Sequence, residues 1–372
     1  MMRLGATVAL AGTFVLMLAA SALGYEVRAF DGTSRAAKVE DFSPRIDKTE
    51  NSSNKFYGEQ YSFDTRLDGD ANFWFQIVIS NMGLSNGKAG LLVDFKPDGK
   101  KKIKARTSLE RAQWSYDTSG GTLTLKLGDS TFSGDGKQWK GHFVTDQFDA
   151  DFTVTNAVAA YRPGGGAVYY GAGNDYYYDI TVLTPRGRFE ADVTLKETGE
   201  KVHLAGTAYG DHSVMNLSPN FQAKRWARFR TIGSSTTVIV SLFETAPEYQ
   251  GKWVGWIMVV SDKGIVGCGV NPKVEVSDFD TDEKSGYSVP RVLVMSEASG
   301  LEGFQGAIQG TKRTARKDKL ADLSAVERAV VSKLVQPIEF KYSASYELKF
   351  TAGGKDKSYK GNVTYQFEQI TK

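Results

Sequence analysis

The sequence predicts an all-β protein of many short antiparallel strands, arranged as barrels or sandwiches. Glycine occupies 39 of the 372 positions and aromatic residues make up 12% of the chain, a composition typical of strands joined by tight turns. Several segments alternate apolar and polar residues with the period of a strand that has one buried and one solvated face. Clusters of turn-forming residues separate these segments at intervals of roughly eight to twelve residues.

The strand segments can be followed along the chain. Residues 73–80 (FWFQIVIS) are apolar on both faces, which predicts a strand that is covered on both sides. Residues 121–129 (GTLTLKLGD) and 188–195 (RFEADVTL) alternate with a period of two, as do 341–350 (KYSASYELKF) and 363–370 (VTYQFEQI). Strands are therefore expected in both halves of the chain.

One segment in the C-terminal half has helical periodicity instead. Its apolar positions at helical spacing are Leu323, Val326, Val330 and Leu334. Ser324 and Glu327 have the spacing of a capping box. We expect a short amphipathic helix at 321–335 that packs on a barrel wall or closes one end, and the alternative is a helix that binds a partner.

The N-terminus has the pattern of a secretory signal peptide. A short positive start at Arg3 precedes the apolar run 6–20, and small residues at 21–24 predict cleavage after Gly24. The mature chain is therefore expected in the periplasm or outside the cell, and a retained N-terminal anchor is the alternative. The single cysteine, Cys268, cannot form an internal disulfide.

The expected organisation has four parts. Residues 1–24 are the signal peptide, and 25–55 form a polar, extended and only partly ordered lead-in. Two strand-rich halves of similar size follow, 56–205 and 206–372.

Several kinds of partner are not indicated. The formal net charge is only +3 with mixed signs, and the basic stretches 101–104 and 311–319 lack interleaved aromatics, so no nucleic-acid partner is expected. The glycine-rich 164–173 has neither the lysine nor the helix of a phosphate loop. His142, His203 and His212 are scattered without ligand spacing, so neither a metal nor a cofactor is predicted.

The stretch 206–229 carries the candidate chemistry. Asp211 and His212 are the one acid–base pairing that stands out. Adjacent residues on a strand point to opposite faces, whereas at a turn they can share a site. The structural alternative is a corner at which Asp211 caps backbone amides and His212 bonds to a neighbouring segment.

This stretch resembles the AttH and hydroxyneurosporene-synthase (carotenoid hydratase) superfamily, and more closely its survival-factor-like branch. The matching features are Gly206, Tyr209, Asp211, His212, Pro219, Trp226, Phe229 and the segment SLFETAP at 241–247. Residues 73–83 and the closing strands are also similar, so the resemblance covers roughly 55–372. It implies two tandem lipocalin-like (calycin) barrels, with either hydration of an isoprenoid double bond or the carriage of lipid.

One departure favours the carrier. Hydratase-type members have an Asp in the segment that matches residues 225–228, and here that position is Ala227. Alanine cannot protonate an alkene, so Asp211 would be the remaining acid. Arg225, Arg228 and Arg230 are expected to lower its pKa.

We therefore expect an exported carrier that holds a lipid or isoprenoid in a lipocalin-type cavity, with transient membrane contact. Tyr178, Tyr209, Trp226 and Arg228 are the expected ligand-binding residues, at the cavity or at the seam between the barrels. The alternative is a hydratase, cyclase or isomerase on a terpenoid-like substrate, with Asp211 as general acid beside His212. A purely structural protein is the third hypothesis, and it predicts barrel interiors filled by Trp and Phe. The sequence does not indicate an oligomeric state.

Overall fold

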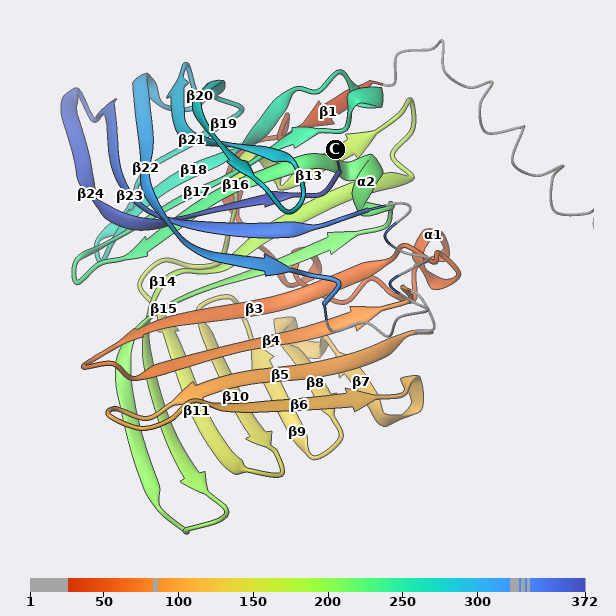
Figure 1. Cartoon of the computed structure of the whole chain (residues 1–372). Coiled ribbons are helices and arrows are strands. Elements are labelled where there is room, and N and C mark those ends of the chain that lie inside the picture. The colour runs from red at the N-terminus through yellow and green to blue at the C-terminus, as the bar shows by residue number, and fades with distance from the viewer. Residues whose placement is uncertain (1–25, 83–85, 322–327, 329–331, 333–334, 372) are drawn as a thin grey trace, which may run out of the picture.

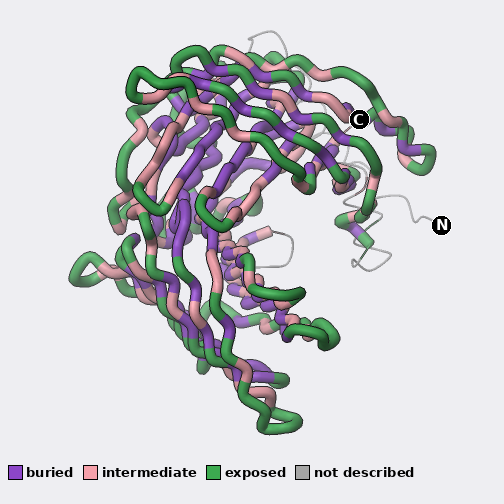
Figure 2. Tube along the Cα trace, turned by 90° about the vertical axis from the view of Figure 1, so that its left-hand side faces the viewer, coloured by how far each residue is buried: buried purple, intermediate pink, exposed green. Residues whose placement is uncertain are grey.

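The computed structural model describes residues 26–82, 86–321, 328, 332 and 335–371, and nearly all of its regular structure is antiparallel β-sheet. Two sheets stack on one another, the first drawn from orange to green and the second from green to blue in Figure 1. Buried and exposed positions alternate along their strands (Figure 2). The all-β, tandem-barrel prediction is confirmed. No helix among the described residues is long and apolar enough to cross a membrane. The amphipathic helix expected at 321–335 lies mostly outside the described residues.

The first sheet curls into a nearly closed barrel. Its strands follow the order β6-β5-β4-β3-β15-β14-β11-β10-β9-β8-β7. They are β3 (Gly58–Leu67), β4 (Asn72–Ser80), β5 (Lys88–Lys96), β6 (Ile103–Leu109), β7 (Trp114–Asp117), β8 (Leu123–Leu127), β9 (Ser130–Gly134), β10 (Gln138–Val144), β11 (Phe148–Asn156), β14 (Tyr176–Leu195) and β15 (Lys201–Met215). The end strands β6 and β7 are joined by η2 (Arg111–Gln113). The short connection brings the two ends of the sheet near each other.

The second sheet forms a half-barrel. It contains β16 (Ala223–Ile232), β17 (Thr236–Thr245), β18 (Trp253–Ser261), β19 (Gly264–Val270), β20 (Lys273–Asp282), β21 (Tyr287–Ser296), β22 (Glu302–Asp318), β23 (Ile338–Ala352) and β24 (Lys355–Gln369). Their order is β19-β18-β17-β16-β24-β23-β22-β21-β20, so β19 and β20 are its edges. Short 3-10 turns η3 (Ser119–Gly121), η4 (Pro163–Gly165) and η5 (Pro247–Tyr249) connect other strands of the chain.

The lead-in is more ordered than the polar sequence suggested. It forms β1 (Val27–Ala29), β2 (Arg35–Ala36), η1 (Val39–Asp41) and α1 (Thr49–Ser52), and its two strands pair with β13 (Ala167–Tyr170) and β12 (Tyr161–Arg162). Phe42 and Ile46 are buried in the core of the first sheet. These two buried apolar side chains hold the lead-in against the barrel, although the segment has neither helical nor strand periodicity.

The two sheets divide later in the chain than residue 205. β15 runs without a break to Met215, the short helix α2 (Pro219–Gln222) follows, and β16 begins at Ala223. The prediction of a corner at Asp211 is wrong, because this residue lies within β15 and pairs with both β14 and β3. Gly206 also lies inside the strand, where a Cβ would come within 2.2 Å of the Arg66 carbonyl oxygen. Close backbone approach, and not a turn, thus requires this glycine.

Aromatic side chains fill the interior of the first barrel. Phe75 contacts Phe63, Phe143 and Phe152, with ring centroids 4.9–5.0 Å apart. Phe132 stacks on Trp139 at 5.4 Å. Two open hollows, of about 600 and 410 Å³, lie instead on solvent-facing sides of the strands. A barrel interior filled by Trp and Phe is what the hypothesis of a purely structural protein predicts. The contact between the two sheets is therefore the better candidate for a ligand site.

We call this contact the inter-sheet seam, where β14 and β15 of the first sheet face β16, β17 and β18 of the second. Its apolar core takes side chains from both sheets and from the lead-in. Arg186, almost fully buried on β14, crosses the seam and donates to the carbonyl oxygens of Gly233 and Ser234 at 2.9 and 2.6 Å. It also pairs with Asp262 at 2.5 Å. The two sheets are therefore joined by polar contacts as well as by apolar burial.

Candidate functional site

Asp211 and His212 point to opposite faces of β15, as expected for neighbours on a strand. Asp211 lies at the inter-sheet seam, 3.6 Å from Arg230 of the second sheet. His212 lies inside the first sheet, where it is fully buried and stacks on Tyr61 with ring centroids 4.3 Å apart. The two residues do not share a site, so an acid–base dyad between them is excluded by the strand geometry.

The seam brings together aromatic residues from both sheets. Tyr178 of β14 contacts Trp226 of β16 edge to face at 5.4 Å, and Trp226 lies 4.5 Å from Phe243. Tyr178 also contacts Phe243 at 5.8 Å. Tyr178 and Phe243 are buried, whereas Trp226 is only partly buried. The three rings form an aromatic wall with one edge accessible to solvent.

Two arginines of β16 lie at the seam, and one of them contacts this wall. The Arg228 guanidinium lies 5.3 Å from the Trp226 ring centroid and pairs with Glu368 at 3.0 Å. Arg230 lies 4.2 Å from the centre of the Tyr209 ring and pairs with Asp64 at 2.9 Å. The four residues expected to bind a ligand, Tyr178, Tyr209, Trp226 and Arg228, therefore all lie at the seam.

The Asp211 carboxyl is the acidic group of this region. Burial raises its pKa above the ordinary value, although Arg230, a hydrogen bond from Tyr209, and Arg228 all act in the opposite direction. Arg230 and Arg228 do lower this pKa, as expected, but the net shift is upward because the cost of desolvating the carboxylate outweighs them. Asp211 thus has the property required of a general acid, namely a carboxyl that is easier to protonate than usual.

The residue that replaces the hydratase acid, Ala227, does not face the seam. Ala227 is buried in the interior of the second sheet, on the opposite face of β16 from Trp226 and Arg228. Arg225 shares that opposite face and pairs with Glu244. Neither residue contributes to the seam.

The tyrosines that precede Tyr178 in the chain lie in several different regions of the molecule. Tyr170 is buried in the seam, and Tyr177 faces the lead-in, where its hydroxyl accepts from Asn51 at 2.9 Å. Tyr169 lies under Arg28, and Tyr176 is exposed. The tyrosine-rich stretch therefore supplies contacts to several regions and does not line one opening.

A second polar region lies on the His212 side, and we call it the Glu59 cluster (Tyr57, Glu59, Tyr61 and His212). His212 Nε2 is 2.6 Å from the Glu59 carboxylate, which also accepts from the hydroxyls of Tyr57 and Tyr61. Among the described residues, His212 Nδ1 has no hydrogen-bond partner. Glu59 thus anchors the ring through one nitrogen and leaves the other without a bond.

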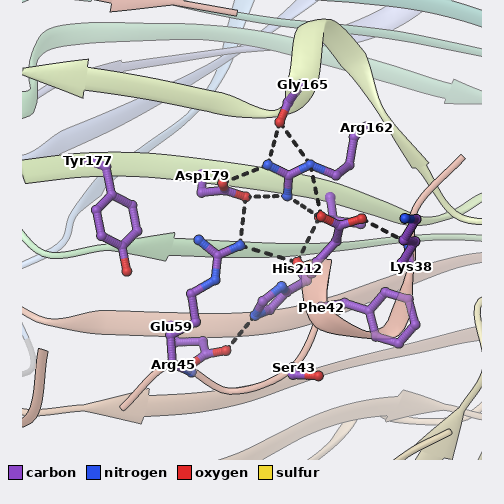
Figure 3. Close-up of polar contacts among 12 residues, drawn as sticks. Lys38, Phe42, Ser43, Arg45, Glu59, Arg162, Gly165, Tyr177, Asp179 and His212 are labelled. Atoms are coloured by element: carbon purple, nitrogen blue, oxygen red, sulfur yellow. Dashed lines mark hydrogen bonds and ion pairs between the residues drawn. The ribbon is translucent and has the colours of Figure 1, made fainter. Parts of the chain in front are cut away.

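A network of alternating charges connects this region to the lead-in (Figure 3). Arg162 donates to both oxygens of Asp179 at 2.7 and 2.8 Å, and Arg45 of the lead-in reaches the same carboxylate at 3.2 Å. Asp41 of η1 approaches Arg162 at 3.5 Å. We call these four residues the lead-in network. Because every charge in this network faces an opposite charge, the network joins the lead-in to β12 and β14.

Sequence reasoning missed this network and Glu59 because the members are far apart in the chain. The local signal was a charge within an otherwise apolar strand, as at Asp179 in YYYDITVL. Such a residue is rarely buried unless it is paired. The identity of the partner could not be read from spacing.

Comparisons with known proteins place this arrangement in a family. A family model described as the Svf1 family matches residues 47–368. A putative AttH from Nitrosomonas europaea has a similar structure, with a TM-score of 0.50 and 13% identity over 87% of this chain and 96% of that one. A structure of CghA with Sch210972 is similar with a TM-score of 0.52 and 11% identity, over 94% of this chain and 99% of that one. Curated proteins give no significant sequence match. The structural likenesses support the tandem lipocalin-like fold.

Proposed function

Since this chain belongs to the Svf1 family, we propose that it is an exported carrier of an apolar lipid or isoprenoid, bound at the inter-sheet seam. The observation that carries this proposal is the convergence of Tyr178, Trp226 and Phe243 into a wall with one accessible edge. The first barrel is filled by its own aromatic rings, so its interior is the less favourable place for a ligand.

An apolar chain laid along this wall would gain affinity from burial, at about 0.8 kcal/mol for each CH₂ group. Arg228 lies against Trp226 of the wall, and Arg230 lies against Tyr209 elsewhere at the seam; both are partly exposed and would orient a polar end of the ligand. Both guanidiniums already face carboxylates. The ligand's polar end is therefore expected to be small and to accept hydrogen bonds without a large negative charge.

Transient membrane contact is part of the proposal. Phe56, Tyr176 and Phe221 are about half exposed, and contacts of Asn216 connect their segments. Asn216 accepts from Asn54 through its carbonyl oxygen and donates to the Asp175 carbonyl oxygen. Aromatic side chains at one end of a lipid carrier would suit the interface of a bilayer.

The carrier function can be tested by purifying the mature chain from periplasm, extracting it, and identifying lipids by mass spectrometry. We expect a lipid or isoprenoid to co-purify, and Trp226→Ala to lose most of it. Trp253→Ala is the matched control, because this tryptophan is partly buried on the second sheet and packs against the interior core of that sheet. A lipid-free protein that also takes up no lipid from vesicles would contradict the proposal, and recovery from the cytoplasm would contradict export.

An enzyme is the second candidate, because burial raises the pKa of Asp211 at the same seam. In this hypothesis Asp211 protonates a terpenoid-like substrate held against the aromatic wall, as in a hydratase, cyclase or isomerase. We expect Asp211→Asn to abolish turnover while Asp64→Asn, which removes the other carboxylate paired with Arg230, retains it. Turnover that persists in Asp211→Asn would exclude this role.

A further inference from the structure

One buried tryptophan at the inter-sheet seam has a polar atom without a partner. Trp256 of β18 is 1% exposed and belongs to the apolar core that both sheets share. Among the described residues, its indole Nε1 has no hydrogen-bond partner. A buried indole N–H usually donates to an acceptor, because burial removes its hydrogen bonds to water. Within the described part of the chain, the Trp256 N–H is therefore a donor that still requires an acceptor.

Two other buried tryptophans show the usual arrangement. Trp114 Nε1 donates to the Gly87 carbonyl oxygen at 2.8 Å, and Trp139 Nε1 donates to the Leu183 carbonyl oxygen at 3.1 Å. Both rings lie in the core of the first sheet. The fold thus satisfies the indole N–H inside the filled barrel and leaves it unsatisfied at the seam, where the proposed ligand would lie.

Cross-strand register connects Trp256 to the aromatic wall. Trp226 and Phe243 of the wall are cross-strand partners. Two residues further along the same face, Arg228 is the partner of Ser241, and Ser241 is the partner of Trp256. Side chains two residues apart on a strand share a face and lie about 7 Å apart. A row from Arg228 through Ser241 to Trp256 therefore runs beside the wall.

This row leads from solvent into the buried core. The Arg228 side chain is 37% exposed, and Ser241 is partly exposed although it faces the seam from an inner strand of the sheet. Its neighbours on that face, Ile239 and Phe243, are buried. Trp256 at the other end of the row is buried as well. Solvent therefore reaches the seam at Ser241, next to the strand position of the unpaired indole donor.

We propose that Trp256 donates its N–H to a neutral oxygen acceptor within the ligand, such as the carbonyl oxygen of a ketone, ester or amide. This inference rests on the proposed carrier function and names the class of its ligand: an apolar chain with an oxygen part-way along it, and not a plain hydrocarbon. The acceptor is neutral, because a charged oxygen would lose its hydration at this depth.

The row also sets the approximate spacing of the ligand's polar groups. Arg228 would meet the polar end of the ligand, and Trp256 its inner oxygen. Two inter-strand steps of about 4.8 Å separate the two residues, so their backbones are about 10 Å apart. The aromatic wall would cover the apolar chain alongside.

The test compares dioctyl ketone with heptadecane, which has the same chain length and lacks only the central carbonyl. Each probe is offered in phosphatidylcholine vesicles to the mature chain after its own lipids have been extracted, and the bound amount is measured by gas chromatography. We expect the unaltered chain to bind the ketone more tightly. Trp256→Phe should weaken ketone binding about tenfold, because it leaves the carbonyl unpaired, and should change heptadecane binding little.

Trp139→Phe is the matched control, because it shortens a buried tryptophan whose N–H already has the Leu183 carbonyl as its partner. This control is expected to bind both probes like the unaltered chain. Urea unfolding without lipid supplies a second readout. Both substitutions reduce packing, but only Trp139→Phe removes a hydrogen bond, so it should be the less stable of the two variants.

The outcomes separate this inference from the carrier proposal. Equal binding of the two probes by the unaltered chain, or equal weakening of both by Trp256→Phe, would overturn the inference and leave the carrier proposal standing. A ketone preference that Trp256→Phe does not change would do the same. A chain that takes up neither probe would contradict the carrier proposal and this inference with it.

Discussion

Two aspartates in the first sheet have pKa values shifted in opposite directions: Asp179 in the lead-in network, which is buried, and Asp211 at the seam, whose side chain is 18% exposed. Burial disfavours the charge of both carboxylates. At Asp179 the pKa is nevertheless lowered, because Arg45 and Arg162 together outweigh burial. At Asp211 the pKa is raised, because burial prevails over Arg230 at 3.6 Å. Two close arginines keep Asp179 charged, so that it stabilises the fold. Asp211 has weaker arginine contacts and is easier to protonate.

The largest effect is expected from breaking the lead-in network. Asp179→Ala leaves the Arg45 and Arg162 guanidiniums buried without their shared partner, which costs about 3–5 kcal/mol in the free energy of unfolding. The measurement is urea unfolding at neutral pH. Asp149→Ala is the control, because it removes an exposed pair and is expected to cost about 0–1 kcal/mol. A similar small loss for both variants would show that the network does not stabilise the fold.

A smaller loss is expected on the interior face of β15. His212→Ala removes the ring that contacts the Glu59 carboxylate and leaves part of it unpaired, at a cost of about 1–3 kcal/mol. His212→Gln places an amide nitrogen near the position of Nε2 and is expected to recover much of that loss.

Equal destabilisation by the Ala and Gln substitutions would contradict a role for the hydrogen bond to Glu59 and would assign the loss to packing against Tyr61. Unfolding in urea, followed by tryptophan fluorescence, distinguishes these outcomes.

The sequence predicted the strands well, because alternation is a local property of each segment. Tyr178, Tyr209, Trp226 and Arg228, which were expected at a cavity or at the seam, lie at the seam, and their binding of a ligand stays a prediction. The sequence could not show which face of β15 each member of the Asp211–His212 pair occupies, because it did not reveal that the strand continues through them. The Glu59 cluster depends on cross-strand register, which is set by the whole sheet and not by spacing along the chain.

The smallest effect, and the sharpest test of the comparison, is the pH dependence of the two aspartates. The lowered pKa of Asp179 means that its contribution to stability is present above the ordinary carboxyl pKa of about 4 and is lost as the pH falls through its folded value. The raised pKa of Asp211 means the reverse: its contribution is present below about pH 4 and is lost as the pH rises through its folded value. Asp179→Asn should therefore be less stable than the unaltered chain at neutral pH, with a difference that narrows in acid.

For the same reason, Asp211→Asn should be at least as stable as the unaltered chain at neutral pH, because it removes a charge that burial disfavours. Its advantage should disappear in acid, where Asp211 is protonated. Urea midpoints measured from about pH 3.5 to 8 for the three proteins provide the comparison. If the stabilities of the two variants depend on pH in the same way, the arginine contacts do not distinguish the two carboxylates. The hypothesis that Asp211 is a general acid would then lose its support.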